Sequence, residues 1–352
     1  MSDKRTWIRL PRNVLVGHGV SDDIEAVLDE LHPGASVLVV TSPTPRDVIG
    51  RALIDRLVDH GVDVDDIVIE EATLSTVEEV SDRLEAVGAE VLFGVGGGKV
   101  IDVTKVVSHQ FGRPFVSVPT AASHDGIVSN RASIPDGEHR HSVAARPPTA
   151  VVADTTIIAD APWKLTTAGS ADIISNYTAV TDWRLAHRLK NEPYSEYAAA
   201  LSEMTAELLV NEATSIKEGL EESAWIVSKA LVSSGVAMSI AGSSRPASGA
   251  EHLFSHQLDR LVPGAALHGH QVGVGAIMTS YLQWGEDGVW EQLSNALSTI
   301  GAPTNAVDLG IDPEVIIEAL TTAHEIRDRY TILGDGISES AARRVAAETG
   351  VI

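Results

Sequence analysis

The sequence lacks cysteine entirely and has few of the features that would point to a secreted or membrane protein. With no cysteine among 352 residues, disulfides and thiolate metal ligands are excluded, so any metal ion must be held by histidine, aspartate or glutamate. No apolar run approaches the roughly 20 residues that a membrane-spanning helix needs. The first residues, MSDKRTWIRLPRN, have no apolar core of the signal-peptide kind. We therefore expect a cytoplasmic protein without an integral membrane segment.

Basic residues are also scarce. Lysine and arginine total 26 against 49 aspartates and glutamates, which gives a net charge of −23, and only seven residues are lysine. The acidic residues are spread along the chain instead of forming a tail. Concentrated salt screens the self-repulsion of such a surface, so the composition is typical of a salt-rich, halophilic cytosol; an ordinary acidic enzyme is the alternative. Nucleic acid and anionic membranes are poor partners for this charge.

The two halves of the chain differ in their hydrophobic pattern. Helical patterns separate several short β-branched runs in the first half, at 36–40, 66–70, 91–95, 114–118 and 150–154. This alternation predicts βαβ units and a mainly parallel sheet covered on both faces. After residue 160 the pattern is helical with almost no strand signal. We expect an α/β domain over residues 1–160 and an all-α domain over 161–352, with a ligand in the cleft between them.

A glycine-rich stretch follows the run at 91–95. Residues 94–102 read GVGGGKVID, and the backbone amides of Gly98, Lys99 and Val100 would open the next helix toward a pyrophosphate. The stretch departs from the usual dinucleotide fingerprint, because Lys99 stands where the third glycine would be and because it follows a late strand. A tight turn without a ligand is the alternative.

A polar loop is expected after the next strand. In SVPTAASHDGIVSN, residues 117–130, the polar side chains include Thr120, Ser123, His124, Asp125 and Ser129. Ligands of doubly wound sheets bind at the carboxyl ends of the strands, so this loop is a candidate ligand site. A solvated capping loop is the alternative. The polar, turn-rich stretch at 131–150 is expected to form a hairpin or flap.

Four histidines lie within nineteen residues: His252, His256, His268 and His270. His252 and His256 are four residues apart and so share one helix face. Without cysteine, a metal site would use two histidines and one carboxylate and leave one position open for substrate. Asp172 is the favoured carboxylate, because its small and apolar neighbours predict a packed helix in which an acid needs a partner. The alternatives are ordinary buried or surface histidines and a structural aspartate.

Five segments, in chain order, carry a resemblance over nearly the whole chain. They resemble the metal-dependent polyol dehydrogenases, a family that includes glycerol dehydrogenase, the iron-type alcohol dehydrogenases and 3-dehydroquinate synthase. Two segments, GSSRPASGAEH and SHDGIVSNRASI, are most similar to the archaeal branch that reduces dihydroxyacetone phosphate to sn-glycerol 1-phosphate for ether lipids. The five segments are GGGKVIDVTK, VPTAASHDGIVS, GSADIISN, SRPASGAEHLFSH and LHGHQVGVG.

The resemblance implies a metal site and its surroundings. It implies one zinc ion per subunit, bound by Asp172, His252 and His268, with His256 facing the substrate. His268 begins the family's His-Gly-Glu pattern, but this chain has His270 in place of the glutamate, which keeps His270 as an alternative. Asp125, Asp172 and His256 would contact the substrate and take part in catalysis.

The resemblance also implies a nicotinamide cofactor. The run after the first buried strand contains no acid that would repel a 2′-phosphate, so both NAD(H) and NADP(H) are expected to work. The pyrophosphate would lie on the glycine-rich stretch and the nicotinamide beside the polar loop. The implied cofactor contacts are Gly97, Gly98, Lys99, Val100, Ile101 and Asp102, followed by Thr120, Ala121, Ala122, Ser123 and Ser129.

The implied reaction is hydride transfer to a zinc-polarised carbonyl. His256 or Asp125 would supply or relay the proton. Arg245, in the segment SSRPAS, is our hypothesis for the phosphate-binding residue, and a structural arginine is its alternative. We expect a homo-oligomer. The rival functions are a glycerol dehydrogenase that acts on an unphosphorylated polyol, and a nucleotide- and metal-binding regulator without turnover.

Overall fold

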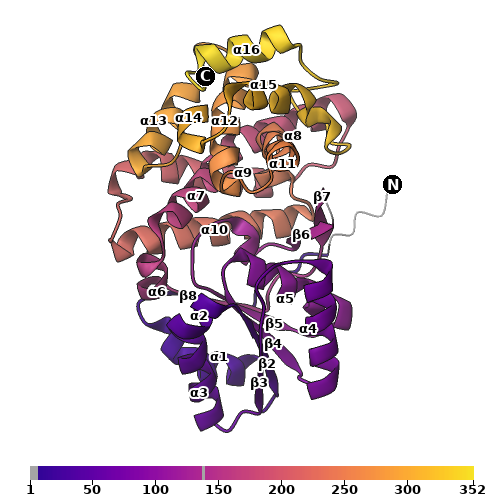
Figure 1. Cartoon of the computed structure of the whole chain (residues 1–352), viewed down its shortest axis with the longest axis vertical. Coiled ribbons are helices and arrows are strands. Elements are labelled where there is room, and N and C mark those ends of the chain that lie inside the picture. The colour runs from indigo at the N-terminus through magenta and orange to yellow at the C-terminus, as the bar shows by residue number, and fades with distance from the viewer. Residues whose placement is uncertain (1–6, 137–138) are drawn as a thin grey trace.

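Six short strands form one parallel sheet. The computed structural model describes residues 7–136 and 139–352 (Figure 1). The strand order is β1-β8-β5-β4-β2-β3, and all neighbours in it are parallel. Every residue of β2, β4, β5 and β8 is buried, as expected for strands with helices on both faces. The strands are β1 (Asn13–Gly17), β2 (Val37–Thr41), β3 (Val64–Val68), β4 (Val91–Gly96), β5 (Phe115–Pro119) and β8 (Ala150–Asp154).

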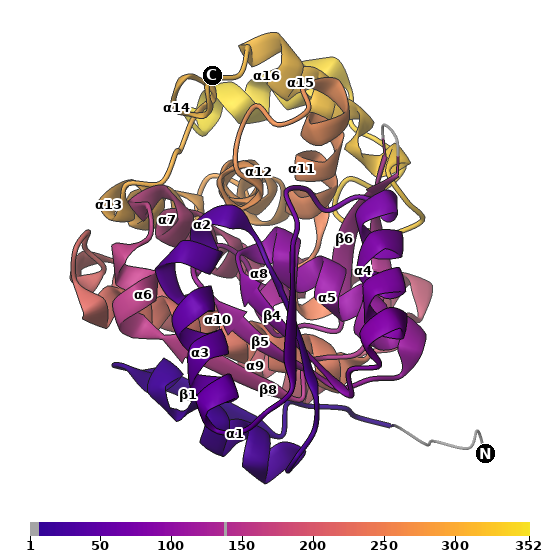
Figure 2. The same cartoon turned by 60° about the horizontal axis from the view of Figure 1, so that its bottom comes forward.

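Helices cover both faces of this sheet. Figure 2 shows α1 and α3 on one side of the strands and α4 and α5 on the other. Their apolar residues belong to two different core clusters, one on each face. The elements are α1 (Ile24–Leu31), α2 (Pro43–Pro45), a π-helical segment (Arg46–Gly50), α3 (Arg51–Asp59), α4 (Leu74–Val87) and α5 (Gly98–Phe111).

The polar stretch after β5 forms an antiparallel hairpin, as predicted, from β6 (Arg131–Asp136) and β7 (His139–Ala144). From residue 155 onward all described elements are helical. They are α6 (Thr155–Asp160), α7 (Trp163–Ile174), α8 (Asn176–Lys190), α9 (Glu196–Asn211), α10 (Glu221–Ala241), α11 (Ala250–Leu261), α12 (His268–Trp284), α13 (Trp290–Ile300), α14 (Ala306–Leu309), α15 (Pro313–Thr322) and α16 (Glu339–Glu348).

The predicted fold class is confirmed: a parallel α/β half precedes a helical half. The pattern missed β1, which pairs with β8 at the edge of the sheet although 132 residues separate the two strands. One core cluster runs from sheet residues such as Leu38 to helical residues such as Ile316, so the two halves share a continuous core. The division at residue 160 stays a prediction.

Helix α10 alone among the described helices is long and apolar enough to cross a membrane. Half of its most apolar window is buried inside the protein, and it packs against α6, α7 and α9. Its apolar character is therefore explained by its place as a core helix of this fold.

Candidate active site

A cavity of about 550 Å³ lies between the carboxyl ends of β4 and β5 and the helical half. It brings together parts of the chain that are up to 256 residues apart, from Glu71 to Arg327. The lining residues are Glu71, Ala72, Thr73, Gly98, Lys99, Asp102, His124, Asp125, Gly126, Ser129, Arg131, Ala132, Ser133, Met238, Ser244, Ala247, Ser248, His252, His256, His268 and Arg327.

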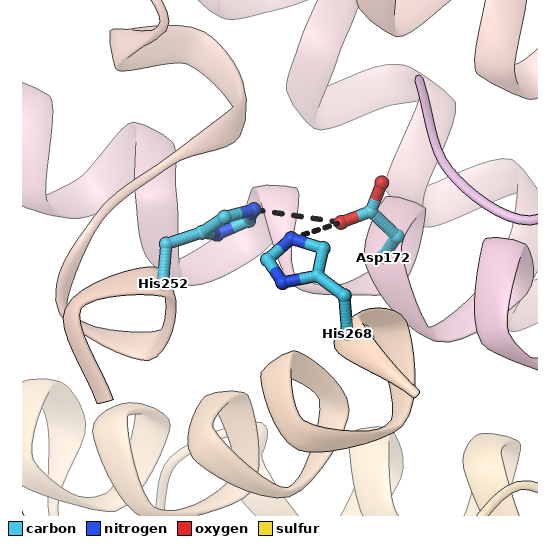
Figure 3. A group of neighbouring side chains, drawn as sticks. All are labelled: Asp172, His252 and His268. Carbon is cyan, nitrogen blue, oxygen red and sulfur yellow. Dashed lines mark ion pairs between the residues drawn. The ribbon is translucent and has the colours of Figure 1, made fainter. Parts of the chain in front are cut away.

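Three predicted metal ligands meet beside this cavity. Asp172 lies in the third turn of α7, His252 in the first turn of α11, and His268 begins α12 (Figure 3). The Nε2 atoms of His252 and His268 are 3.4 and 3.9 Å from the same oxygen, Oδ1 of Asp172. One ligand atom from each residue lies within 4.8 Å of the others. Zinc–ligand bonds of about 2.0–2.1 Å in a tetrahedron separate ligand atoms by about 3.4 Å, so this donor set fits zinc.

A buried glutamate orients the first histidine. Glu251 Oε1 lies 3.0 Å from His252 Nδ1, so this ring nitrogen donates to the carboxylate and Nε2 is left for a metal. Glu251 is fully buried and also accepts hydrogen bonds from the Gly249 amide and from Thr178 Oγ1. Burial alone would lower the pKa of His252, but its bonds to Asp172 and Glu251 raise it to about 9. These two carboxylates therefore create a potential that favours a cation.

A hydroxyl orients the second histidine. His268 Nδ1 lies 3.0 Å from Ser255 Oγ, which itself donates to Gln271 Oε1 at 2.7 Å. Because the hydroxyl proton goes to Gln271, His268 donates from Nδ1 and presents Nε2 to Asp172. His270 is not part of this group. Its Nε2 lies 2.8 Å from Thr167 Oγ1, and burial lowers its pKa to about 4.

His256 and Asp125 lie next to the triad and line the cavity. His256 follows His252 by one turn of α11, and its ring centroid is 6.5 Å from that of His252 and 5.7 Å from that of His268. The Asp125 amide donates to Asp172 Oδ2 at 3.1 Å, and its side chain accepts from Ser234 Oγ at 2.9 Å. Burial, followed by the charge of Asp172, raises the pKa of Asp125 to about 7.

The glycine-rich stretch joins β4 to α5 at the cavity, and Gly98, Lys99 and Asp102 line it. Val100 and Ile101 point into the core instead. A Cβ on Gly98 would lie 1.9 Å from His124 Nε2, so glycine is required here because His124 packs over the start of the helix. At Gly97, by contrast, an added Cβ would have no other heavy atom within 4 Å, so the space beside this residue is open.

The polar loop contributes fewer cavity residues than expected. Ser129 lines the cavity together with His124 and Asp125, whereas none of the four residues at 120–123 does. Ala121 and Ala122 are buried beneath the loop. Their predicted contact with a nicotinamide ring is left without support from the cavity lining.

A buried lysine that the sequence reasoning missed fixes this loop. Lys105 Nζ donates to the carbonyl oxygens of Gly126 and Arg131 at 2.5 Å each and lies 3.3 Å from Asp102 Oδ1. Asp102 Oδ2 accepts from the Ser133 amide at 3.0 Å. The predicted cofactor residue Asp102 therefore also anchors the loop and hairpin to α5.

The structure does not bring Arg245 to the cavity wall. Its guanidinium forms a two-pronged ion pair with the Glu192 carboxylate, with Nε 2.6 Å from Oε1, and donates to the Tyr330 carbonyl at 2.8 Å. Arg327 and Arg131 line the cavity, and Arg245 does not. No local sequence signal distinguishes Arg327, because it reaches the site only through the fold.

Comparison with known proteins agrees with this arrangement. Residues 15–162 match the family described as iron-containing alcohol dehydrogenase. Two solved glycerol dehydrogenases share the fold: a probable one from Sinorhizobium meliloti (TM-score 0.79, 23% identity, 98% of both chains) and one from Schizosaccharomyces pombe (TM-score 0.80, 19% identity, 99% of this chain and 92% of the other). At these identities the likeness shows the fold alone, which is the fold of the two solved glycerol dehydrogenases.

Relatives with higher sequence identity define the family within this fold class. The glycerol-1-phosphate dehydrogenase of Haloarcula marismortui is 66% identical over the full length of both chains. The one from Methanothermobacter thermautotrophicus is 54% identical and covers 98% of this chain and 99% of its own. The chain therefore belongs to the glycerol-1-phosphate dehydrogenase family. Many of its relatives come from halophilic archaea, which agrees with the acidic composition.

Proposed function

We propose that this protein is an enzyme that reduces dihydroxyacetone phosphate to sn-glycerol 1-phosphate with NADH or NADPH. The observation that carries the proposal is the triad of Asp172, His252 and His268 beside a cavity that also holds the glycine-rich start of α5. Relatives of 54–66% identity are named as NAD(P)+-linked glycerol-1-phosphate dehydrogenases, which supports the same substrate and cofactor here. In an archaeal cell the product would serve ether-lipid synthesis.

The residues of the site have separate roles in this proposal: metal binding, orientation of the metal ligands, and cofactor binding. Asp172, His252 and His268 would hold a zinc ion, which when bound polarises a carbonyl oxygen as a Lewis acid. Glu251 and Ser255 hold the two imidazoles with Nε2 toward that position. The amides at the start of α5 and the open backbone of Gly97 would receive the cofactor pyrophosphate.

Two groups beside the triad are suited to proton transfer. Burial and the charge of Asp172 raise the pKa of Asp125 to about 7, and its carboxylate accepts a hydrogen bond from Ser234 on α10. His256 lines the same cavity one helical turn from His252. In the direction of reduction, one of them would give a proton to the substrate oxygen, and the other would bind a substrate hydroxyl.

The division between metal ligand and proton donor is directly testable. Asp172→Asn removes the charged ligand that both histidines share, so zinc content and activity should fall together. His256→Ala should keep zinc near the wild-type content and lose rate, by about 10²–10⁴-fold if it transfers the proton. Zinc analysis of the purified variants decides this, and equal zinc loss in both would contradict the assignment.

The substrate is tested by following NADH and NADPH absorbance in molar KCl with dihydroxyacetone phosphate and dihydroxyacetone in parallel. The proposal expects strong oxidation with the phosphate, only weak oxidation with dihydroxyacetone, and a product that an sn-glycerol-3-phosphate-specific dehydrogenase ignores. Equal or better turnover of dihydroxyacetone would indicate a glycerol dehydrogenase. Tight nucleotide binding with no turnover of either compound would indicate a regulator.

We also infer a cytoplasmic homo-oligomer. Three large apolar side chains are exposed along α9: Tyr197, Met204 and Leu208, at 83%, 51% and 57%. An exposed apolar stripe of this kind is typical of a contact between subunits. Light scattering after size exclusion in high salt measures the assembly, and a monomer at micromolar concentration would contradict this inference.

A further inference from the structure

The wall of the cavity formed by the helical half contains an arginine with unused hydrogen-bonding capacity. Arg327 lies in the segment between α15 and α16 and lines the cavity. Its Nη2 donates to Ser248 Oγ at 2.8 Å, while its Nε is buried and has no hydrogen-bond partner within residues 7–136 and 139–352. A buried guanidinium N–H without an acceptor costs free energy, so this arrangement favours an acceptor supplied by a ligand.

A second arginine approaches the same place from the other half of the protein. Arg131 begins β6, lines the cavity, and also has a buried Nε without a partner in the described part of the chain. The two guanidinium groups are near enough for the charge of Arg131 to lower the pKa of Arg327. Two adjacent guanidinium groups with available N–H donors can form several charge-assisted hydrogen bonds with the oxygens of one phosphate group.

Within the described residues, no carboxylate forms an ion pair with Arg327. Burial, followed by the charges of Arg131 and Arg245, lowers its pKa to about 10, and Glu251 is the acid that opposes this shift. Glu251 already accepts bonds from His252, Gly249 and Thr178. Arg327 therefore stays charged at neutral pH and has no counter-ion of its own among residues 7–136 and 139–352, in a chain whose net charge is −23. An excess of positive charge at one cavity wall of such an acidic protein indicates an anionic ligand.

The other candidate cations nearby are committed to protein groups. Arg245 is paired with Glu192. Arg329 donates to the Ser248 carbonyl and, at 2.8 Å, to Ser244 Oγ, so it supports the wall without lining the cavity. The N-terminus of α11 is also occupied, because the Gly249 amide donates to Glu251 and the Ala250 amide donates to Asp182. Of the described arginines near this wall, Arg327 and Arg131 are therefore the two that line the cavity and can bind an anion.

We propose that Arg327, together with Arg131, binds the phosphate group of the three-carbon substrate, with the Ser248 hydroxyl positioning the Arg327 guanidinium. The inference rests on the proposed function and replaces Arg245 as the phosphate-binding residue. Ser248 lies four residues before the metal ligand His252, so the anion site adjoins the triad. A phosphate held there leaves the rest of a short substrate within reach of the metal position. Because the two arginines come from different halves of the fold, the phosphate also links the two sides of the cavity.

The test compares phosphorylated and unphosphorylated substrate on zinc-loaded enzyme in high salt. For Arg327→Ala we expect the KM for dihydroxyacetone phosphate to rise about 10–100-fold, the size of a lost charge-assisted bond pair. The KM for dihydroxyacetone should change less than twofold. Inorganic phosphate, used as a competitive inhibitor, should weaken in parallel. Arg327→Lys keeps the charge and should lose less than the alanine variant.

Control variants test whether the effect comes from the charge at residue 327. Arg184→Ala removes an arginine from a distant ion pair with Glu203 and should leave both KM values unchanged. If Arg327→Ala does not fold, Arg327→Gln gives the same comparison, because its amide still reaches toward Ser248 but carries no charge.

Four results would overturn the proposal. The first is a wild-type KM for dihydroxyacetone phosphate in all Arg327 variants. The second is an equal rise in KM for both ketones. The third is a rise in KM that occurs with NADPH as the cofactor but not with NADH, which would assign Arg327 to the cofactor 2′-phosphate. The fourth is a larger effect from Arg245→Ala. Failure of the proposed function itself is distinguishable, because it appears in the wild-type enzyme as no preference for the phosphorylated ketone.

Discussion

Glu251 offers a sharp test of the proposed metal site. The substitution Glu251→Gln keeps the shape of the side chain and removes only its charge. Glu251 is fully buried, and its two oxygens accept from His252 Nδ1, the Gly249 amide and Thr178 Oγ1. The amide oxygen of glutamine still accepts from His252 and Gly249. Its NH2 group takes the place of the oxygen that accepts from Thr178, and it would donate to Thr178 Oγ1 while the Thr178 proton turns to the Ser175 carbonyl. What is lost is the negative charge 3.0 Å from the imidazole that carries the metal ligand atom.

The size of the effect follows from that loss. Removing the acidic partner of a metal-binding histidine lowers metal affinity by about 10–100-fold, which corresponds to about 1.4–2.7 kcal/mol. We expect the zinc dissociation constant of Glu251→Gln to rise by this factor, while its zinc-saturated form keeps a measurable rate. Competition with a chromophoric chelator at fixed pH and salt measures the constant.

A control variant and the melting temperature of the metal-free protein separate an effect on zinc affinity from an effect on stability. His270 stands where the family pattern has glutamate, but it contacts Thr167, so His270→Asn should leave zinc affinity unchanged. A zinc dissociation constant for Glu251→Gln within twofold of wild type would refute the role of the charge. If the metal-free variant instead melts far below the metal-free wild type, Glu251 acts mainly through stability.

Two further predictions concern buried charges away from the triad. Lys105→Met removes a buried cation that binds two carbonyl groups and a carboxylate. The free energy of unfolding should therefore fall by about 3–5 kcal/mol. A urea titration in constant salt measures this change, and a loss under about 1 kcal/mol would contradict the prediction. Burial and the nearby charge of Glu251 raise the pKa of Asp182 to about 7, so the folded state keeps a proton that the unfolded state releases above about pH 4. This contribution to stability is lost as pH rises from 4 to 7. The stability of Asp182→Asn should therefore fall less, or rise more, than that of wild type over that range, and parallel curves for the two proteins would contradict the assignment.

Local sequence patterns were sufficient for the α/β half of the fold. The β-branched runs that predicted strands overlap β2, β3, β4, β5 and β8. For β2, β4, β5 and β8 the reason is burial, because a parallel strand covered on both faces must be apolar along its length, whereas β3 is a partly exposed edge strand. The hydrophobic pattern did not predict the edge strand β1, because none of its five residues is fully buried and its partner β8 is remote in sequence. The hairpin at 131–144 followed from turn-rich composition.

The sequence also determined much of the candidate metal site. The absence of cysteine limited the ligands to histidine and carboxylate, and the spacing of His252 and His256 put both on one face of α11. Spacing alone did not decide between His268 and His270; the resemblance to a known family did. The structure then gave the physical distinction: His268 faces Asp172, and His270 faces Thr167.

Tertiary structure alone decided which charged groups are available for a ligand. Arg245 and Arg327 both lie in polar segments, and nothing local separates them. In the folded protein, Arg245 pairs with the carboxylate of Glu192, 53 residues earlier. Arg327 donates to Ser248, 79 residues earlier, and its Nε has no acceptor in the part of the chain that the structure describes. Secondary structure depends on neighbours in the chain and is readable from it, whereas the charge balance of a site depends on groups that only folding brings within a few ångströms.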